Sequence, residues 1–359
     1  MKKLLLLSLA ITVLSCNKYI EPETPAKIFE KYQNAVVLIT NQYYYEVYLD
    51  DKTLIYYSPY SADKIYYSEE SILENLSMIT GTGFIVSENG EIITNRHIVN
   101  PAAVNYREDF YSYNEELKEK MVNAISKYDD TIQMIKNYYA DNEQQLDDFE
   151  KKNLVNEFDS YKELKEIFMG FYESQKNFDI DKTQVKPVIY RLAIAYNNTH
   201  ITDLNDLQEC VLIRESSAEN VDLALIQTKT QLFDKPPKNK INFDDNNPNL
   251  ARSLKKYSER NIKNPVSINE DVYMIGFNHG FSLANTKQGI KSQFTSGEVS
   301  QESDGERILY TIPTLEGSSG SPIIDKWGNL VAVNFAKVSD TQSFSFGVPL
   351  KAVKEFYEE

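Results

Sequence analysis

The stretch GSSGSPIIDKWGNLVAV, residues 317–333, decides the fold of this chain. It holds two short apolar runs, 322–324 and 330–333, on either side of the turn sequence Lys326-Trp327-Gly328-Asn329. Short runs rich in β-branched residues and separated by turn residues are typical of strands in a β-sandwich or β-barrel. The stretch therefore predicts two strands of an all-β unit.

Similar runs occupy two blocks of the chain, and glycine is concentrated in the same blocks, whereas the long interior stretch between them holds only Gly170. The runs are Gly83-Phe-Ile-Val86 and Glu91-Ile-Ile-Thr94 in the first block, and Val272-Tyr-Met-Ile275 and Arg307-Ile-Leu-Tyr310 in the second. The composition of residues 187–195 and 210–213 is again typical of β-strands. We therefore expect a mostly β protein.

The interior stretch has a different, helical pattern. Apolar residues recur at spacings of three and four from Leu117 to Tyr139 and again from Leu154 to Phe171, with polar residues between them. This spacing predicts two amphipathic helices, joined by a turn at 140–143. We expect an inserted helical hairpin over 105–180, in which the aromatic stripes pack against each other rather than bind a ligand.

Composition restricts the class of partner. The 359 residues include 38 basic and 53 acidic side chains, a formal net charge of −15, and 42% are hydrophobic. These proportions are those of a soluble globular protein. A net negative charge argues against nucleic acid and anionic lipid as partners, because both are negative themselves.

Residues 1–16 are typical of a secretory signal, with Lys2 and Lys3 before the apolar run Leu4–Leu14. The run is too short to span a bilayer. Its end, Val-Leu-Ser-Cys16, resembles the lipobox of bacterial lipoproteins, although a residue smaller than Leu14 is more usual there. The resemblance implies that Cys16 becomes the acylated first residue; the alternative is an ordinary cleaved signal peptide. Only Cys210 would then remain, as a buried small hydrophobe without a disulfide partner.

Three segments supply the groups that serine-dependent peptide cleavage needs: a base, a carboxylate that orients it, and a nucleophile. His97 lies in Thr94–Val99 after a predicted strand, Asp222 precedes the apolar run 223–226, and Ser319 lies in the loop 317–322. Glycine on both sides of that loop allows the sharp turn that aims backbone N–H groups at an oxyanion.

These segments resemble the trypsin-like (chymotrypsin-clan) serine proteases, and within them the bacterial HtrA-type, or Deg, branch. Gly81-Thr-Gly-Phe-Ile-Val86 resembles the strand before the histidine loop of that family. His97, Asp222 in Asp-Leu-Ala-Leu, and Ser319 match its base, acid and nucleophile in the same order. Three further segments resemble strands of that family's second barrel: Val272–Gly276, Thr295–Val299 and Phe346–Leu350. The similarity covers roughly 25–100 and 187–359.

The chain also departs from the family. Ser321 stands where glycine is commoner, and Ser318 stands where Asn or Asp is frequent, so the charge partner used in zymogen-type activation is missing. Ser318 is the competing nucleophile, but the Gly-x-Ser-Gly register favours Ser319. The helical hairpin separates His97 from Asp222, and we expect no peptide-binding PDZ domain after the second barrel.

The resemblance implies two antiparallel β-barrels (chymotrypsin-like) whose residues meet in a cleft. We expect a signal peptide at 1–16, a first barrel at 25–228 interrupted by the hairpin at 105–180, a connection at 229–268, and a second barrel at 269–359. The backbone N–H groups of Gly317 and Ser319 would form the oxyanion hole. No cofactor is implied, and with three histidines in the chain no metal site is expected.

The pocket for the residue before the cleaved bond follows from the same alignment. Pro313 stands where enzymes selective for Arg or Lys carry a buried aspartate, so a cation would enter without a partner. The other wall would be Asn334, Phe335 and Ala336. We expect small or medium apolar residues before the cleaved bond; alternatively, Phe335 points away and the pocket is open.

The expected partners are protein or peptide substrates, with a lipid anchor at Cys16 that holds the protein in the bacterial cell envelope. The anchored face could be the periplasmic side of either membrane or the cell surface. Two alternatives to an active protease stay open. One is a catalytically silent trypsin-like scaffold, and the other is a tethered interaction lipoprotein that binds peptides or a partner through the helical hairpin.

Overall fold

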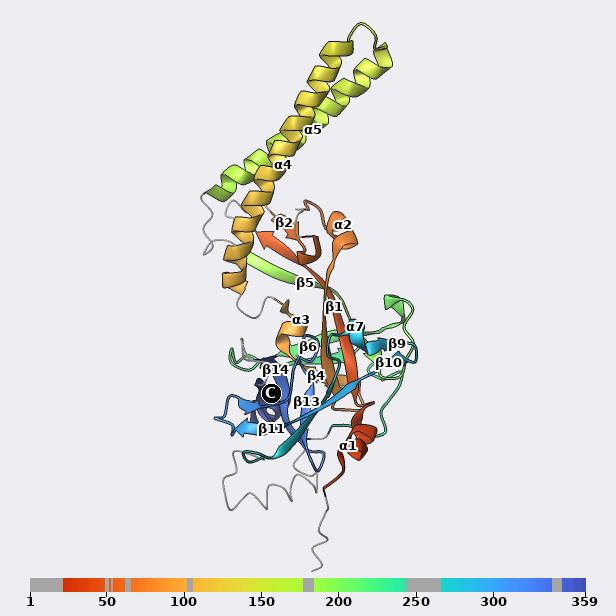
Figure 1. The fold of residues 1–359 in the computed structure, drawn as a ribbon, viewed down its shortest axis with the longest axis vertical. Coiled ribbons are helices and arrows are strands. Elements are labelled where there is room, and N and C mark those ends of the chain that lie inside the picture. Colours follow the sequence, from red (N-terminus) through yellow and green to blue (C-terminus); the bar gives the residue numbers. More distant parts are fainter. Residues whose placement is uncertain are drawn as a thin grey trace, which may run out of the picture.

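The computed structural model describes residues 22–48, 52, 54–61, 66–101, 106–176, 184–241, 243, 266–337 and 344–359. Two closed antiparallel β-barrels lie together at one end, and a helical hairpin extends away from them (Figure 1). The predicted fold class, mostly β with two barrels and an inserted helical hairpin, is confirmed.

The first barrel is a sheet in the order β1-β3-β4-β7-β6-β5, which the pairing of β5 with β1 closes. A further strand, β2, pairs with the outer end of β1. The strands are β1 (Val36–Tyr48), β2 (Leu54–Tyr57), β3 (Ser77–Ile85), β4 (Glu91–Thr94), β5 (Gln184–Tyr196), β6 (Gln208–Glu215) and β7 (Ala224–Thr228).

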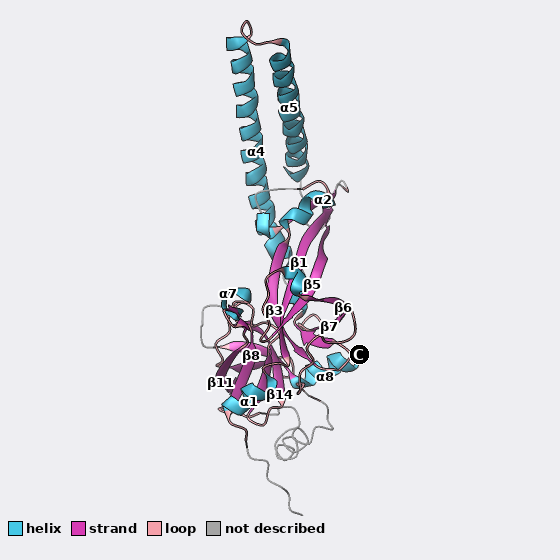
Figure 2. Ribbon diagram, turned by 90° about the vertical axis from the view of Figure 1, so that its right-hand side faces the viewer, coloured by secondary structure: helices cyan, strands magenta, loops and turns pink. Residues whose placement is uncertain are grey.

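Strands β1 and β5 are longer than the barrel needs. Each has 13 residues, and beyond the register shift at Gln42/Tyr43 they continue as a paired ribbon to Tyr48 and Gln184. The helical hairpin stands beyond the end of this ribbon (Figure 2). The insertion therefore leaves and re-enters the first barrel without interrupting its closed sheet.

The second barrel closes in the order β11-β12-β15-β14-β13-β8. Its hairpin β13–β14 contains the apolar runs 322–324 and 330–333, and Pro322 pairs there with Val333. Its interior is filled by aliphatic, aromatic and methionine side chains such as Val272, Tyr310 and Met274. The strands are β8 (Asp271–Gly276), β11 (Gln293–Gln301), β12 (Ile308–Tyr310), β13 (Pro322–Asp325), β14 (Leu330–Lys337) and β15 (Ser345–Pro349).

The two barrels share one hydrophobic core, in which Phe84 of the first packs in the same cluster as Ile275 and Phe277 of the second. The C-terminal helix α8 (Leu350–Glu358) reaches back to the first barrel. There the guanidinium of Arg214 donates to the carbonyls of Phe356 at 2.7 Å and Tyr357 at 2.6 Å. The relative position of the barrels is thus fixed by both apolar and polar contacts.

The hairpin consists of α4 (Tyr106–Asn142) and α5 (Asp148–Lys176), so the turn follows the predicted 140–143 by a few residues. Asp129 and Lys165 form an ion pair at 2.6 Å across the two helices. At the base, the ring of Phe171 lies 4.9 Å from that of Tyr67. Phe171 also packs against the buried pair Val47 and Ile55 on the ribbon.

The remaining elements are short. They are helices α1 (Pro25–Tyr32), α2 (Glu69–Ile72), α3 (Arg96–Val99) and α7 (Phe281–Ala284), 3-10 turns η1 (Pro59–Ser61), η2 (Leu73–Asn75) and η4 (Leu204–Asp206), and strands β9 (Asn285–Thr286) and β10 (Gly289–Ile290). Within the described ranges, no helix is both long and apolar enough to cross a membrane. Residues 1–21, which include Cys16, lie outside the described residues.

Candidate active site

His97 lies on α3, the single helical turn that follows β4. The two residues before His97 bind that turn to the loop that precedes β7. Asn95 donates through its side-chain amide to the carbonyl of Asp222 at 2.7 Å. Arg96 donates to the carbonyls of Ser216 at 3.1 Å and Glu219 at 3.0 Å. The local sequence Asn-Arg-His therefore attaches the histidine turn to the segment that carries the predicted acid.

Both oxygens of the Asp222 carboxylate bind His97. One oxygen lies 2.6 Å from Nδ1 of the imidazole, and the other accepts a hydrogen bond from the backbone N–H of His97 at 3.1 Å. Asp222 is only 9% exposed, so little solvent competes for these bonds. Because Nδ1 is held by the carboxylate, Nε2 is the nitrogen left to act as a base.

The loop that carries Ser319 comes from the second barrel but is held by the first. The backbone N–H of Thr82 on β3 donates to the Ser319 carbonyl at 2.8 Å, and the Thr82 hydroxyl donates to the Gly317 carbonyl at 2.9 Å. The Thr94 hydroxyl donates to the carbonyl of Thr82 at 2.8 Å. Since Thr94 lies three residues before His97, these bonds bring the serine loop beside the histidine turn.

The structure thus brings the three predicted residues to the same edge of the barrel interface. Ser319 is half-buried. Within the described residues, no hydrogen bond joins the Ser319 hydroxyl to His97. Catalytic hydrogen bonds are often long or poorly aligned in proteins without substrate.

Gly317 and Gly320 both have left-handed backbone conformations, with φ of +87° and +85°. A Cβ at Gly317 would lie 2.5 Å from the carbonyl of Phe277, and one at Gly320 would lie 2.0 Å from the carbonyl of Thr82. The loop therefore requires glycine at both positions, for conformation and for space.

The peptide before Gly317 has a defined direction. The carbonyl of Glu316 accepts the backbone N–H of His279 at 2.5 Å. In a trans peptide the following N–H points the opposite way, so the Gly317 N–H faces away from His279. In the described part of the chain, neither this N–H nor that of Ser319 donates to another protein group. These are the two donors expected for the oxyanion hole.

The four predicted pocket residues lie in different environments. Pro313 is exposed. Asn334 is buried, and its side chain contacts the serine loop. Phe335 is half-buried and stacks on Phe346, with ring centroids 6.3 Å apart. Ala336 pairs with Phe346 through its backbone, and its side chain lies outside the described part. Of these four residues, Phe335 is the one with an observed aromatic partner.

The contacts of Thr82 and Thr94 and the close approach of Ser321 to Gly276 were not identified from the sequence. Thr82 stands between Gly81 and Gly83, a pattern that indicated close backbone approach and could have identified it. Ser321 is fully buried, and its hydroxyl lies 2.0 Å from where a Cβ at Gly276 would be. Serine fits at this position because residue 276 has no side chain.

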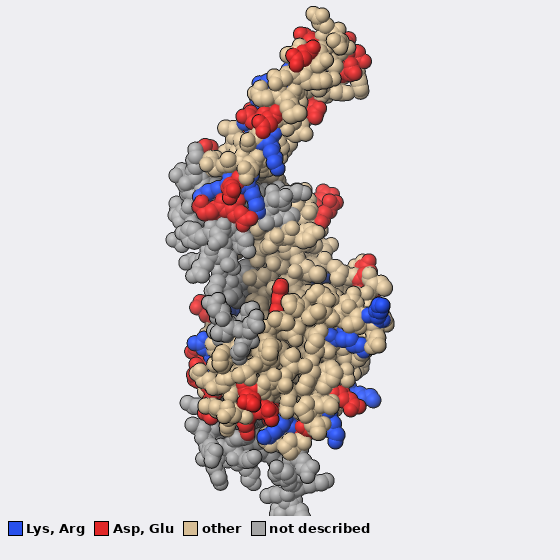
Figure 3. Space-filling view, in the orientation of Figure 1, with Lys and Arg blue, Asp and Glu red and all other residues tan. Residues whose placement is uncertain are grey.

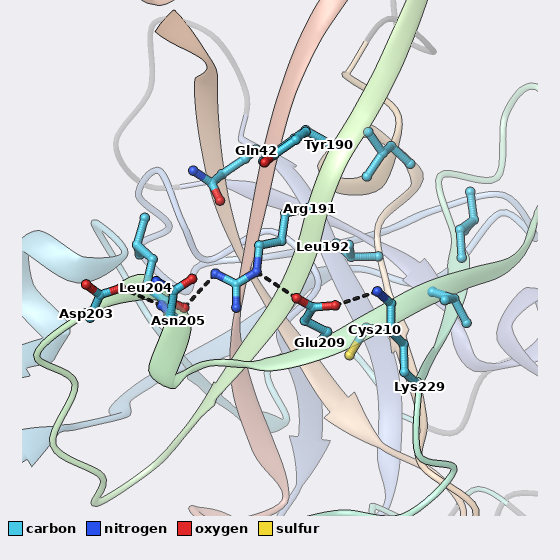
Figure 4. Close-up of a pocket in the computed structure, with 13 residues that line it drawn as sticks. Gln42, Tyr190, Arg191, Leu192, Asp203, Leu204, Asn205, Glu209, Cys210 and Lys229 are labelled. Carbon is cyan, nitrogen blue, oxygen red and sulfur yellow. Dashed lines mark hydrogen bonds and ion pairs between the residues drawn. The ribbon is translucent and has the colours of Figure 1, made fainter. Parts of the chain in front are cut away.

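A cavity of about 800 Å³ lies elsewhere, on β5 and β6 of the first barrel (Figure 4). Three of its charged groups are paired, since Arg191 and Lys229 both bind Glu209, and a fourth, Asp203, caps the turn η4. Cys210 also lines it, and burial raises the pKa of its thiol to about 12, which keeps it protonated. The cavity contains none of the three predicted triad residues.

Among the described residues, no group of three or more His, Cys, Asp or Glu side chains could hold a metal ion. On the face shown in Figure 3, acidic side chains lie along the hairpin and the barrels, and most basic ones have an acidic neighbour. This face therefore lacks a broad basic surface of the kind that binds nucleic acid.

Residues 183–333 match the family model of the trypsin-like peptidase domain. The match includes Asp222 and Ser319 and begins after the helical hairpin, so it does not reach His97. The chain also aligns with the crystal structure of the serine endoprotease from Yersinia pestis, at 13% identity and a TM-score of 0.44. That alignment covers 94% of this chain and 67% of the other. A sequence search of curated proteins gave no match.

Proposed function

We propose that this protein is a serine endopeptidase that hydrolyses peptide bonds of proteins through His97, Asp222 and Ser319. The observation that carries the proposal is the imidazole held at Nδ1 by Asp222 at 2.6 Å, beside a serine loop that Thr82 binds from the same barrel. The similarity of residues 183–333 to trypsin-like peptidases supports the same reaction class.

In the proposed mechanism, Nε2 of His97 takes the proton of the Ser319 hydroxyl as its oxygen attacks the substrate carbonyl. Asp222 keeps the imidazole in one tautomer and stabilises its charged form. The free N–H groups of Gly317 and Ser319 bind the oxyanion. His97 then protonates the leaving amine, which leaves an acyl-enzyme, and water completes the reaction by the reverse proton transfers.

The environment of Ser318 supports this register. Its hydroxyl donates to the carbonyl of Leu315 at 2.6 Å and lies 3.2 Å from the amide of Asn334, and the residue is only 2% exposed. A hydroxyl already engaged and buried is a poor nucleophile. Ser319 is the more exposed serine of the pair and carries the attack in this proposal.

A peptidyl phosphonate probe tests the proposal, because it reacts covalently with an activated serine. We expect labelling of the wild type, its loss in Ser319→Ala, and its retention in Ser318→Ala. A wild type that stays unlabelled although it is folded would instead support the alternative, a silent scaffold that binds peptides.

Within the class, the motifs that resemble the HtrA branch lead us to propose that the protein belongs to that branch. We propose cleavage after small or medium apolar residues, with Phe335, which stacks on Phe346, as the wall that limits the pocket. A peptide-library profile tests this preference, and dominant cleavage after Arg or Lys contradicts it.

We further propose lipid anchoring at Cys16 in the bacterial cell envelope, on the basis of the sequence of residues 1–16. Fractionation of cells that express Cys16→Ser tests this. The anchored form predicts a shift of the variant out of the membrane fraction or a change in its processed mass. An unchanged distribution and mass would refute lipidation.

The hairpin is the second candidate for function, as a surface for a protein partner. Its far end exposes large apolar side chains, with Met134 at 70% and Phe149 at 72% exposure. Substituting both with serine is expected to leave the turnover of a small peptide unchanged while altering the turnover of large protein substrates. Equal turnover of both substrate types would argue against this role.

A further inference from the structure

Asn334 on β14 lies directly beneath the serine loop and is only 1% exposed. Its backbone N–H donates to the carbonyl of Ser321 at 2.9 Å, and its carbonyl accepts the N–H of Gly320 at 2.8 Å. Its side-chain amide donates to the carbonyl of Ser318 at 3.0 Å. One residue therefore holds the chain immediately before and immediately after Ser319.

The chemistry of the neighbours fixes the direction of the Asn334 amide. The Ser318 carbonyl can only accept, so the amide nitrogen must face it. The amide oxygen then faces the hydroxyl of Tyr310 at 2.8 Å. Tyr310 is fully buried, and burial raises its pKa well above the ordinary value, so the hydroxyl keeps the proton it can donate. The Phe346 carbonyl, 3.0 Å away, is a second acceptor for the same hydroxyl.

The sequence lacks a charged residue at Ser318, where the related enzymes often have Asn or Asp. The hydroxyl of Ser318 instead closes a local turn onto Leu315 at 2.6 Å, and the amide of Asn334 reaches up to the same residue. These neutral hydrogen bonds from within the second barrel hold the loop together with the two bonds that it receives from Thr82 of the first barrel.

We propose that Asn334 is a positioning residue that holds the Ser319 loop in its oxyanion-binding shape, with Tyr310 orienting the amide. The inference rests on the proposed protease function and adds how its site is kept formed. The Asn334 bonds act on the loop from within its own barrel, in addition to those from Thr82 of the first barrel. Removing the Asn334 amide releases the carbonyl of Ser318 and allows the N–H groups of Gly317 and Ser319 to diverge.

The first measurement is kcat and KM on a peptide substrate for the wild type, Asn334→Ala and Asn329→Ala. Asn329 is the matched control, because it is also 1% exposed in the second barrel but binds Asp325 in the β13–β14 turn. We expect Asn334→Ala to lower kcat by roughly 10²-fold with KM changed less than about threefold, as for a lost oxyanion donor. Asn329→Ala is expected to keep kcat.

The second measurement is amide hydrogen exchange at 317–321 in the same three proteins, which does not depend on activity. Exchange should accelerate in Asn334→Ala and stay unchanged in Asn329→Ala. If Asn334→Ala does not fold, Tyr310→Phe replaces it, since this variant removes only the hydroxyl; both effects are then expected in weaker form.

The outcomes separate the two proposals. An active wild type whose kcat and loop exchange are unaffected by the substitution overturns the positioning role and leaves the protease function intact. An inactive wild type with accelerated exchange in the variant overturns the protease function but upholds the role of Asn334 in holding the loop. An inactive wild type with unchanged exchange overturns both.

Discussion

The hydroxyl of Thr94 donates a hydrogen bond of 2.8 Å to the carbonyl of Thr82, and Thr82 in turn binds two groups of the serine loop. One threonine precedes the histidine turn, and the other contacts the Ser319 loop of the opposite barrel. This pair makes the spacing between His97 and Ser319 depend on the β3–β4 hairpin. The site is therefore built across the barrel interface rather than within either barrel.

Replacement of Thr82 by alanine tests this link. The change removes the bond to the Gly317 carbonyl and leaves the N–H of Phe277, which donates to the Thr82 hydroxyl at 3.0 Å, without a partner. We expect kcat to fall roughly 10- to 100-fold, with a loss of about 1–3 kcal/mol in the free energy of unfolding. Thr82→Ser keeps the hydroxyl and should restore most of both. Equal kcat in the alanine and serine variants would contradict a role for the hydroxyl.

Asp222→Asn tests the orientation of the base. Asparagine retains the size of the side chain but cannot stabilise the imidazolium, and its NH₂ group favours the wrong tautomer at Nδ1. We expect kcat to fall by up to roughly 10⁴-fold. The fold should persist, because the Asp222 carbonyl that Asn95 binds is unchanged. Kinetic assay with circular dichroism checks both points, and near-normal turnover would exclude Asp222 from the triad.

Several features of the fold and of the candidate site could be predicted from the sequence because they depend on residues close together in the chain. Periodicity gave the two helices of the hairpin, and turn residues gave the β13–β14 pair. The order of His97, Asp222 and Ser319 indicated the site. The glycines on both sides of Thr82 indicated close backbone approach, but its partners in the serine loop were not predictable, because the bond to the Gly317 carbonyl joins residues 235 positions apart.

The role of Asn334 was only half anticipated, for a related reason. Its position opposite the nucleophile follows from the alignment and suggested a pocket wall. Which way a buried amide points depends on its acceptors, here the carbonyl of Ser318 and the hydroxyl of Tyr310. Those partners are set by barrel closure, which has no signature in the local sequence.

The buried carboxyl of Asp325 is expected to make the free energy of unfolding depend on pH. Burial raises the pKa of its carboxyl to about 6, against hydrogen bonds from Trp327 and Asn329 that favour the charged form. Between the unfolded pKa of 3.8 and this value, the folded state holds a proton that the unfolded state has lost. The contribution of this group to stability is therefore full below the unfolded pKa and is lost as the pH rises through about 6.

Urea unfolding of the wild type and Asp325→Asn at about pH 4.5 and about pH 7 measures this effect. The variant loses contacts at both pH values, so only the change with pH is informative. The wild-type advantage in unfolding free energy should shrink as the pH rises. An advantage that stays constant or grows with pH would show that the folded pKa of Asp325 is not raised.

Deletion of residues 105–180 separates the hairpin from the two barrels. The barrel strands close without it, so we expect a folded protein that still cleaves a small peptide. Removal of Phe171 exposes Tyr67 and the pair Val47 and Ile55, which should lower the melting temperature and promote association. A second deletion variant with Val47→Thr and Ile55→Thr controls for that exposed patch. If both variants are insoluble, the hairpin is part of the folding unit.

The last prediction concerns the contact of Ser321 with Gly276. A Cβ at 276 would lie 2.0 Å from the Ser321 hydroxyl and 3.1 Å from that of Thr82. Gly276→Ala should therefore displace the segment that follows Ser319, and we expect a large loss of kcat and of stability. Ser321→Gly alone should be close to neutral, since the buried hydroxyl has no partner among the described residues.

The double variant Gly276→Ala/Ser321→Gly distinguishes this contact from a general intolerance of alanine in β8. If the two side chains compete for one space, the double variant should recover most of the kcat and stability that Gly276→Ala loses. Recovery should be incomplete, because the Thr82 hydroxyl remains close to the new methyl group. Losses that simply add between the two substitutions would place the strain elsewhere, since contacting residues couple and independent ones do not.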